Sequence, residues 1–250
     1  MWKVSRRRVL FPPVSRASPE GVIAVGGRPD AETLKEAYGR GIFPWPHDGV
    51  PLLWFCPDPR FALVPEEAHV SRSLRKEMRR GVFEVRADTA FREVISRCSR
   101  QRRREQGGTW ITPAMIAGYT ALHDEGLAHS IEAWREGRLV GGLYGVSLGS
   151  VFFGESMFAE IPNASKVAFA TLLANLIRWR FPLVDCQSHT DYLESFGAAE
   201  WPRPRFLAVL QRALEAPTRP GPWSLELGPA AAAEAFAIAD SETPSAKKTS

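Results

Sequence analysis

A carboxylate and a hydroxyl stand inside an otherwise apolar stretch, the residues from Phe152 to Phe158. If this stretch is a strand, side-chain alternation puts Glu155 and Met157 on one face and Ser156 on the other. A carboxylate between apolar neighbours is costly unless it is paired or meets a cationic ligand. A salt bridge at the strand end would also explain Glu155, but a functional role is the better of the two interpretations.

A second group of polar side chains stands at the end of an apolar run, Val184–Gln187. Asp185 and Gln187 can share one face of the strand end, and strand ends at the mouth of a sheet are favoured places for sites. Cys186, with His189 three residues later, could also form a nucleophile and base. We reject that interpretation, because nothing beside Asp185 would stabilise a thiolate and buried cysteine is commonly plain packing.

Three tryptophans, Trp45, Trp54 and Trp110, lie near proline or glycine. Proline fixes φ and removes an amide donor, so 43–46 and 57–59 should be rigid loops. A tryptophan can simply plug such a loop, whereas an exposed one offers a nucleic-acid base a stacking surface. Both interpretations remain open for these residues.

Positive charge is concentrated in one part of a chain whose net charge is only +4. Twelve Lys and Arg residues against four acids lie between Ser71 and Arg104. Five of them recur at helical spacing around Leu74 and Met78, so one face of a short helix can present several cations. A solvated surface is the alternative, but the concentration favours a polyanion such as nucleic acid, held through its backbone. The five are Arg72, Arg75, Lys76, Arg79 and Arg80.

The composition is that of a folded globular protein, with 250 residues, 44% hydrophobic and 24% charged. No apolar run approaches the roughly 20 residues that span a bilayer, and no signal-peptide segment follows the basic start, so we expect a cytoplasmic protein. The three cysteines, Cys56, Cys98 and Cys186, lie far apart and form no CxxC pair. We therefore expect neither disulfides nor a metal site, and no cofactor.

The elements that must position these residues indicate an α+β chain of two domains and a tail. Residues 1–104 predict a small N-terminal α/β domain that carries the basic helix. Residues 105–214 predict a helix, three antiparallel strands, a helix and a strand. That order is typical of an acetyltransferase-like (GNAT-like) α+β catalytic domain, whose strands splay to admit an acyl donor. Residues 215–250, rich in Ala, Pro and Ser, are expected to be weakly ordered.

Several motifs occur in one order along the chain. They are Gly41–Trp45, Trp54 with Pro57–Arg60, Gly108–Thr112, His129–Glu132, Gly154–Phe158, Asn163–Lys166 and Asp185–Gln187. Together they resemble the leucyl/phenylalanyl-tRNA protein transferases of bacteria, over about Phe11 to Leu214. No single motif would be specific, but the ordered set is.

The resemblance implies an enzyme that moves leucine or phenylalanine, with methionine tolerated, from aminoacyl-tRNA to a protein α-amine. The acceptor proteins would begin with Arg or Lys, and the product would be an N-end-rule degradation signal. Asp185 and Gln187 would orient the amine, with Gln187 nearest the reacting centre. Glu155 would stand beside either the donor or the cation of the acceptor. The basic helix would hold the tRNA backbone, and we expect a monomer without membrane partners.

The resemblance also implies substrate contacts. Trp45 and Trp110 resemble the family's contacts to the 3′-terminal adenosine. The apolar pocket for the transferred side chain would be lined by Leu143, Phe152, Met157, Leu172 and Val184. Such a pocket discriminates only weakly between side chains, since one methylene changes the free energy of binding by about 1–3 kcal/mol. The sequence departs from common family residues at Phe55, Cys56, Leu143, Leu172 and Tyr192. At Tyr192 the common family residue is His. These departures affect the preference for the transferred side chain more than the reaction.

Two other functions compete with this one. An acyl-CoA-dependent N-acetyltransferase would need a glycine-rich turn whose amides face a pyrophosphate at a helix start. Residues 161–165 have a proline and no glycine there, which disfavours CoA. A nucleic-acid-binding protein without catalysis would fit the basic segment but would leave Glu155, Asp185 and Gln187 unexplained.

Overall fold

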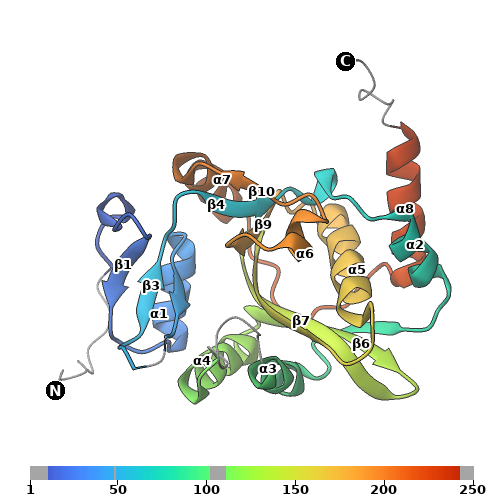
Figure 1. Ribbon diagram of the computed structural model, residues 1–250, viewed down its shortest axis with the longest axis horizontal. Helices are drawn as coiled ribbons and strands as arrows, with labels where there is room; N and C mark the ends of the chain where they lie inside the picture. Colours follow the sequence, from blue (N-terminus) through green and yellow to red (C-terminus); the bar gives the residue numbers. More distant parts are fainter. Residues whose placement is uncertain (1–10, 48, 102–110, 243–250) are drawn as a thin grey trace.

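The computed structural model describes residues 11–47, 49–101 and 111–242 (Figure 1). Within these ranges a small N-terminal sheet stands beside a seven-stranded sheet with helices on both faces. The expected α+β class, with a small N-terminal unit and a larger one, is confirmed. None of the helices in these ranges is both long and apolar enough to cross a membrane.

The N-terminal unit combines a three-stranded antiparallel sheet with one long helix. The sheet has the order β1-β3-β2, and its elements are β1 (Val22–Val25), β2 (Phe43–Trp45) and β3 (Leu53–Phe55), preceded by the short 3₁₀ helix η1 (Val14–Arg16). Helix α1 (Ala31–Gly39) begins at Asp30, whose carboxylate accepts the Thr33 N–H. Tyr38 on its buried side lies 5.0 Å from Phe153 of the large sheet, measured between ring centres. The helix therefore delivers a tyrosine to the central strands.

The seven-stranded sheet has the order β10-β4-β9-β8-β7-β6-β5. Neighbouring strands are antiparallel except β8 and β9, which are parallel and joined by α5. The expected succession of helix, three antiparallel strands, helix and strand is found in α4, β6, β7, β8, α5 and β9. The bounds are β4 (Arg60–Leu63), β5 (Glu84–Ala87), β6 (Ala128–Arg135), β7 (Arg138–Leu148), β8 (Val151–Ala159), β9 (Leu183–Gln187), β10 (Ala199–Trp201), α4 (Pro113–Asp124) and α5 (Ala164–Arg178).

The parallel pair of strands opens partway along its length. Pairing begins at Val151 with Leu183, and its last partners are Phe153 and Asp185. Strand β8 nevertheless continues to Ala159 along β7. The two strands therefore leave a gap at the centre of the sheet, which is the splay expected from the acetyltransferase-like order.

A β-bulge lies where this gap begins. Along β7, Gly154 pairs with Gly145 and Ser156 with Tyr144, which leaves Glu155 as the extra residue of β8. A bulge bends its strand and changes the direction of the side chain at that position. The simple alternation expected for this strand is therefore interrupted at Glu155.

Helices cover both faces of the large sheet. One core contains residues of α3 (Phe91–Arg100), α4 and α7 (Arg203–Leu214), together with the N-terminal unit. The other contains residues of α2 (Arg72–Arg79), α5 and α8 (Pro229–Glu242), with α6 (Asp191–Glu194) packed at its margin and η2 (Pro65–Glu67) nearby. Figure 1 shows α8 beside α2 at the outer side of α5, and the two helices are in contact.

The large sheet crosses the domain boundary expected at residue 104. Strand β4 pairs with β9 and β10, and β5 pairs with β6, although both precede that residue. All four residues of β4 are buried, which a strand achieves when it has partners on both sides. The small unit therefore ends before β4 in the structure.

The C-terminal segment is more ordered than expected. Ala232, Ala233 and Phe236 of α8 are buried against the layer formed by α2 and α5. Upstream of α8, the ring of Trp223 stacks on His129 with 3.7 Å between ring centres. Alanine is the best helix former, and its small side chain lets α8 pack closely, so the expectation of a weakly ordered tail is wrong through residue 242.

Candidate active site

The gap between β8 and β9 opens into a cavity of about 750 Å³. Its walls come from residues 154–159 and 184–190, from β2, and from the facing sides of α5 and α6. Cavities of this volume at the open ends of strands are typical ligand sites. The three candidate catalytic residues, Glu155, Asp185 and Gln187, all lie along this one cavity.

Glu155 is held by three hydrogen-bond donors. Its Oε1 accepts from Tyr38 Oη at 2.6 Å and from Gln187 Nε2 at 2.7 Å. Its Oε2 accepts from Tyr119 Oη at 2.7 Å. A carboxylate has about four lone-pair positions, so these bonds leave one acceptor position on Oε2, on a residue that lines the cavity.

The environment of Glu155 makes its proton easy to exchange near neutral pH. Burial raises the pKa of this carboxyl to about 7, against the lowering effect of the hydrogen bonds from Tyr38 and Tyr119. Burial also raises the pKa of both tyrosines well above 10, so they remain neutral donors. A carboxyl with a pKa close to the working pH is suited to general acid and base catalysis.

Asp185 is bound on both oxygens by an arginine. Arg60 Nε and Nη2 donate to Asp185 Oδ1 and Oδ2 at 2.8 and 2.6 Å, and both side chains are 0% exposed. The guanidinium lies between the rings of Phe43 and Phe206, 4.6 Å from each ring centre. A buried, bidentate pair of this kind fixes the direction of the carboxylate.

Asp185 in turn fixes the backbone of Gln187. The N–H of Gln187 donates to Asp185 Oδ1 at 2.9 Å, and Gln187 has a φ of +64°, a value that side-chain-bearing residues rarely adopt. A bulge at Cys186 in the pairing with β4 accompanies this conformation. Asp185 therefore acts as a positioning residue for Gln187, whose amide reaches Glu155.

The structure divides the expected pocket residues into two groups. Leu143, Met157 and Val184 line the cavity. Phe152 and Leu172 are not among the lining residues, and both pack in the core formed with α5, where they are 0% exposed. In α5 the lining residues are instead Ser165 and Phe169, and in α6 they are Tyr192 and Leu193.

The two tryptophans expected at the adenosine have different outcomes. Trp45 lines the cavity and lies among aromatic rings, with Phe55 and His47 both 5.7 Å from it between ring centres. Trp110 falls outside the described residues. An aromatic cluster at the cavity edge can stack on a base.

The basic helix α2 has acidic partners. Arg75, 7% exposed, pairs with Asp240 of α8 at 2.8 Å, and Arg79 pairs with Glu234 of α8 at 2.6 Å. Arg80 pairs with Glu77 of its own helix at 3.0 Å. In the described parts of the chain, Arg72 and Lys76 form no ion pair with an acidic side chain. The helix therefore presents fewer free cations than its sequence suggests.

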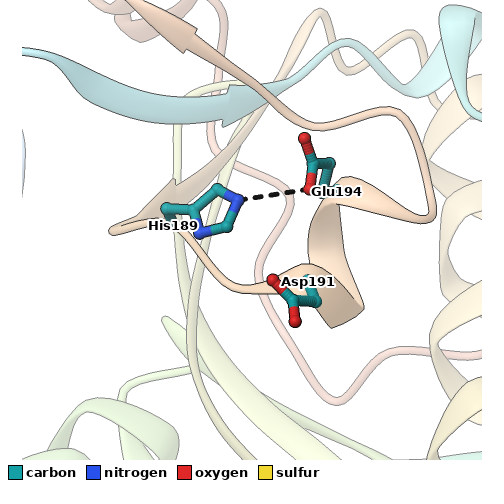
Figure 2. Close-up of side chains that lie close together, drawn as sticks. All are labelled: His189, Asp191 and Glu194. Atoms are coloured by element: carbon teal, nitrogen blue, oxygen red, sulfur yellow. Dashed lines mark hydrogen bonds and ion pairs between the residues drawn. The ribbon is translucent and has the colours of Figure 1, made fainter.

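Three exposed side chains with metal-ligating atoms, His189, Asp191 and Glu194, lie close together (Figure 2), and His189 also lines the cavity. His189 Nε2 lies 3.3 Å from Glu194 Oε2, and Asp191 stands at the start of α6. The contact between His189 and Glu194 already explains their proximity, and all three are open to solvent. We assign no ion to them. The thiol of Cys186 is buried, and burial raises its pKa far above the ordinary value, which disfavours the thiolate that a nucleophile needs.

Sequence reasoning missed Tyr38, Tyr119 and Arg60. Arg60 belongs to the Pro57–Arg60 motif, which contributed to the resemblance. No role was predicted for the positive charge of Arg60. The two tyrosines lie in helices with few polar residues on the buried side, and each is 0% exposed. A buried tyrosine needs a hydrogen-bond partner, so each was a signal of a polar group in the core, although not of which one.

Comparisons with known proteins agree with this geometry. Residues 62–211 match the family model described as "Leucyl/phenylalanyl-tRNA protein transferase", and residues 27–58 match the model for its N-terminal domain. A relative from Myxococcus xanthus is 59% identical over 86% of this chain and 92% of its own length. Relatives from Anaeromyxobacter sp. (53% identical, 89% and 94% covered) and Nitratidesulfovibrio vulgaris (52%, 86% and 92%) carry the same name, leucyl/phenylalanyl-tRNA–protein transferase. The chain belongs to the leucyl/phenylalanyl-tRNA protein transferase family.

Proposed function

We propose that this protein transfers leucine or phenylalanine from aminoacyl-tRNA to the α-amine of proteins that begin with Arg or Lys. The product would be an N-end-rule degradation signal. The family membership supports the reaction class. The observation that carries the assignment of residues is the hydrogen bond between Gln187 and Glu155 at the mouth of the splayed strands. We further propose that the enzyme acts as a monomer in the cytoplasm, and sedimentation would test its oligomeric state.

The acceptor amine would be oriented by Gln187. Because Gln187 Nε2 donates to Glu155, the carbonyl oxygen of the same side chain is free to accept an N–H of the amine. An α-amine has a pKa of about 7.7–8.0, so a sizeable neutral fraction exists near neutral pH. The ester of the aminoacyl-tRNA already carries the activation. Holding the amine against the ester carbonyl is therefore the main task of the site.

Glu155 would accept the proton of the attacking amine. As the C–N bond forms, the nitrogen loses a proton to the open lone pair of Glu155 Oε2. The ester C–O bond then breaks, and the ribose oxygen leaves with a proton returned by Glu155 or by water. A pKa of about 7 makes both the uptake and the release of this proton accessible.

The donor would occupy the rest of the cavity. The apolar walls formed by Leu143, Met157 and Val184 suit a leucine or phenylalanine side chain. Trp45 at the edge suits the adenosine of the tRNA end. The same walls would tolerate methionine, because apolar pockets distinguish side chains of similar size weakly.

The tRNA backbone would lie over α2. Arg72 and Lys76 are the cations of this helix that are exposed and unpaired among the described residues, and Arg80 lies beside them. Arg75 and Arg79 would contribute less while α8 neutralises them. Binding of this kind depends on salt concentration, because each phosphate contact releases counterions.

Transfer of labelled leucine tests the proposed function directly. The enzyme is incubated with leucyl-tRNA and a protein with N-terminal Arg, and label in the protein is measured. The matched control is the same protein with N-terminal Glu, and a parallel reaction contains labelled acetyl-CoA. We expect label only with tRNA and N-terminal Arg, and a loss of about 100-fold in Gln187→Ala with tRNA binding retained. Acetyl transfer, or tRNA binding without any transfer, would contradict the proposal.

A further inference from the structure

Helix α8 is an acidic helix that packs on a basic one. Residues 229–242 contain three acids and no basic residue, whereas α2 contains four cations and one acid. Asp240 pairs with Arg75 at 2.8 Å. Glu234 pairs with Arg79 at 2.6 Å. The two helices lie side by side in Figure 1, so α8 brings carboxylates to cations that could otherwise bind phosphates.

Docked α8 and a polyanion cannot hold these cations at the same time. Arg75 is only 7% exposed beneath α8, so a phosphate cannot reach it while the helix is docked. Helix α2 lies within residues 62–211, which match the family model, and α8 lies beyond them. The acidic helix is therefore additional to the matched part of the chain. By linkage, a polyanion on α2 weakens the docking of α8 by the factor by which docking weakens its own binding.

Few contacts hold α8 in its docked position. Its buried side chains are Ala232, Ala233 and Phe236, of which only Phe236 is large. The side chains of Glu234 and Asp240 are 61% and 56% exposed. Ion pairs with an exposed partner contribute little to stability and are screened by salt. A tRNA backbone presents many phosphates and releases counterions when it binds, so it can compete with this docking.

The chain before α8 is fixed, and a glycine joins it to the helix. Asn175 of α5 is 0% exposed, and its Oδ1 accepts the N–H groups of Glu226 and Leu227 at 2.8 and 3.0 Å. Its Nδ2 donates to the carbonyl oxygen of Leu227 at 2.9 Å. The next residue is Gly228, where no atom of the described residues lies within 4 Å of the position of a Cβ. Gly228 is therefore suited to act as the joint about which α8 turns.

We propose that α8 is an autoinhibitory helix, which turns about Gly228 when the tRNA backbone takes Arg75 and Arg79 from it. With α8 docked, tRNA meets only the unpaired cations of α2, Arg72 and Lys76. With α8 displaced, all four cations of α2 contact phosphates, and binding depends more steeply on salt. This inference rests on the proposed function, since it takes α2 as a tRNA-binding surface.

Hydrogen exchange of the full chain, with and without uncharged leucine tRNA, tests the displacement of α8. We expect the backbone amides of residues 229–242 to exchange about 10-fold faster in the complex, because the docked state is depleted. The amides of α5 serve as the internal reference and should keep their rates. Unchanged or slower exchange in α8 would overturn the proposal. A protein that binds no tRNA at all would instead contradict the proposed function.

Two truncations on the same helix test the competition by affinity. Phe236→Ala removes the one large buried side chain of α8, so a larger fraction of the protein has the helix undocked. We expect the Kd for leucine tRNA to fall about 3- to 10-fold. The matched control is Ile238→Ala, because Ile238 is 57% exposed, and it should leave the Kd unchanged. Equal affinities of the two variants would overturn the proposal, and the hydrogen-exchange experiment tests it without any variant.

Discussion

The cavity between β8 and β9 and the surface of α2 are both charged regions that the sequence marks as functional, and they differ in what lies opposite the charge. In the cavity, Glu155 meets neutral donors and keeps an open acceptor position. On α2, Arg75 and Arg79 meet acids of α8. Charge in a sequence therefore indicates a site only when the fold leaves it unneutralised.

The largest effect is expected from the buried pair below the cavity. Arg60→Gln leaves Asp185 charged and unpaired in the core, and should lower the free energy of unfolding by about 3–5 kcal/mol, as well as abolish transfer. Denaturant unfolding measures the first effect. The double variant Arg60→Gln with Asp185→Asn removes both charges and should recover much of the stability. Equal stability of the single and double variants would mean that the pair is not buried as described.

The next effect concerns the pH dependence of stability. The pKa of Glu155 is raised from 4.5 to about 7 in the folded protein, so the native state keeps a proton that the unfolded chain releases. The resulting stabilisation is complete below about pH 4.5 and is lost as pH rises through about 7. Wild-type stability should therefore fall over this window relative to Glu155→Gln. Parallel curves for the two proteins would show that the carboxyl has an ordinary pKa.

A smaller effect is expected from the tyrosines that hold Glu155. Tyr38→Phe or Tyr119→Phe each removes one donor to the carboxylate, which should raise its pKa further and slow transfer about 10-fold at neutral pH. The midpoint of the pH–rate profile should move to higher pH. Tyr192→Phe is the matched control, since its hydroxyl does not contact Glu155, and it should leave that midpoint in place. A shift of equal size in all three variants would contradict the assignment.

The smallest effect is expected on the surface. Glu234→Gln with Asp240→Asn frees Arg79 and Arg75 from α8, and should tighten tRNA binding a few-fold and steepen its salt dependence. Arg72→Glu should weaken binding more than Arg79→Glu, because Arg79 is already paired. Filter binding at several salt concentrations measures both. Equal losses for the two arginines would show that α8 does not shield this helix.

The sequence predicted the strands of the site better than the groups around them. Alternation and apolar runs depend on neighbours along the chain, so the strands containing Glu155 and Gln187 could be predicted. The bulge at Glu155 depends on pairing with β7, and the bond from Tyr38 depends on packing of an N-terminal helix over 100 residues away. Contacts of that separation leave no local pattern.

The same reason explains the errors at the pocket and at the tail. Phe152 and Leu172 have suitable side chains, but the fold turns them into the core while Phe169 reaches the cavity. The alanine-rich segment of α8 has little hydrophobic bulk of its own, yet α2 and α5 supply the surface against which it packs. Whether a side chain lines a cavity depends on the packing of whole elements.

The rate of a single turnover as a function of pH tests the role of Glu155 most directly. Labelled leucine transfer from tRNA to a protein with N-terminal Arg is measured for wild-type enzyme and for Glu155→Gln, from about pH 6 to about pH 9. We expect the wild-type rate to rise with a midpoint near pH 7. Glu155→Gln should be about 100-fold slower, and should keep only the later rise, at about pH 8, that comes from deprotonation of the acceptor amine. Equal rates, or the same midpoint in both proteins, would contradict Glu155 as the proton acceptor.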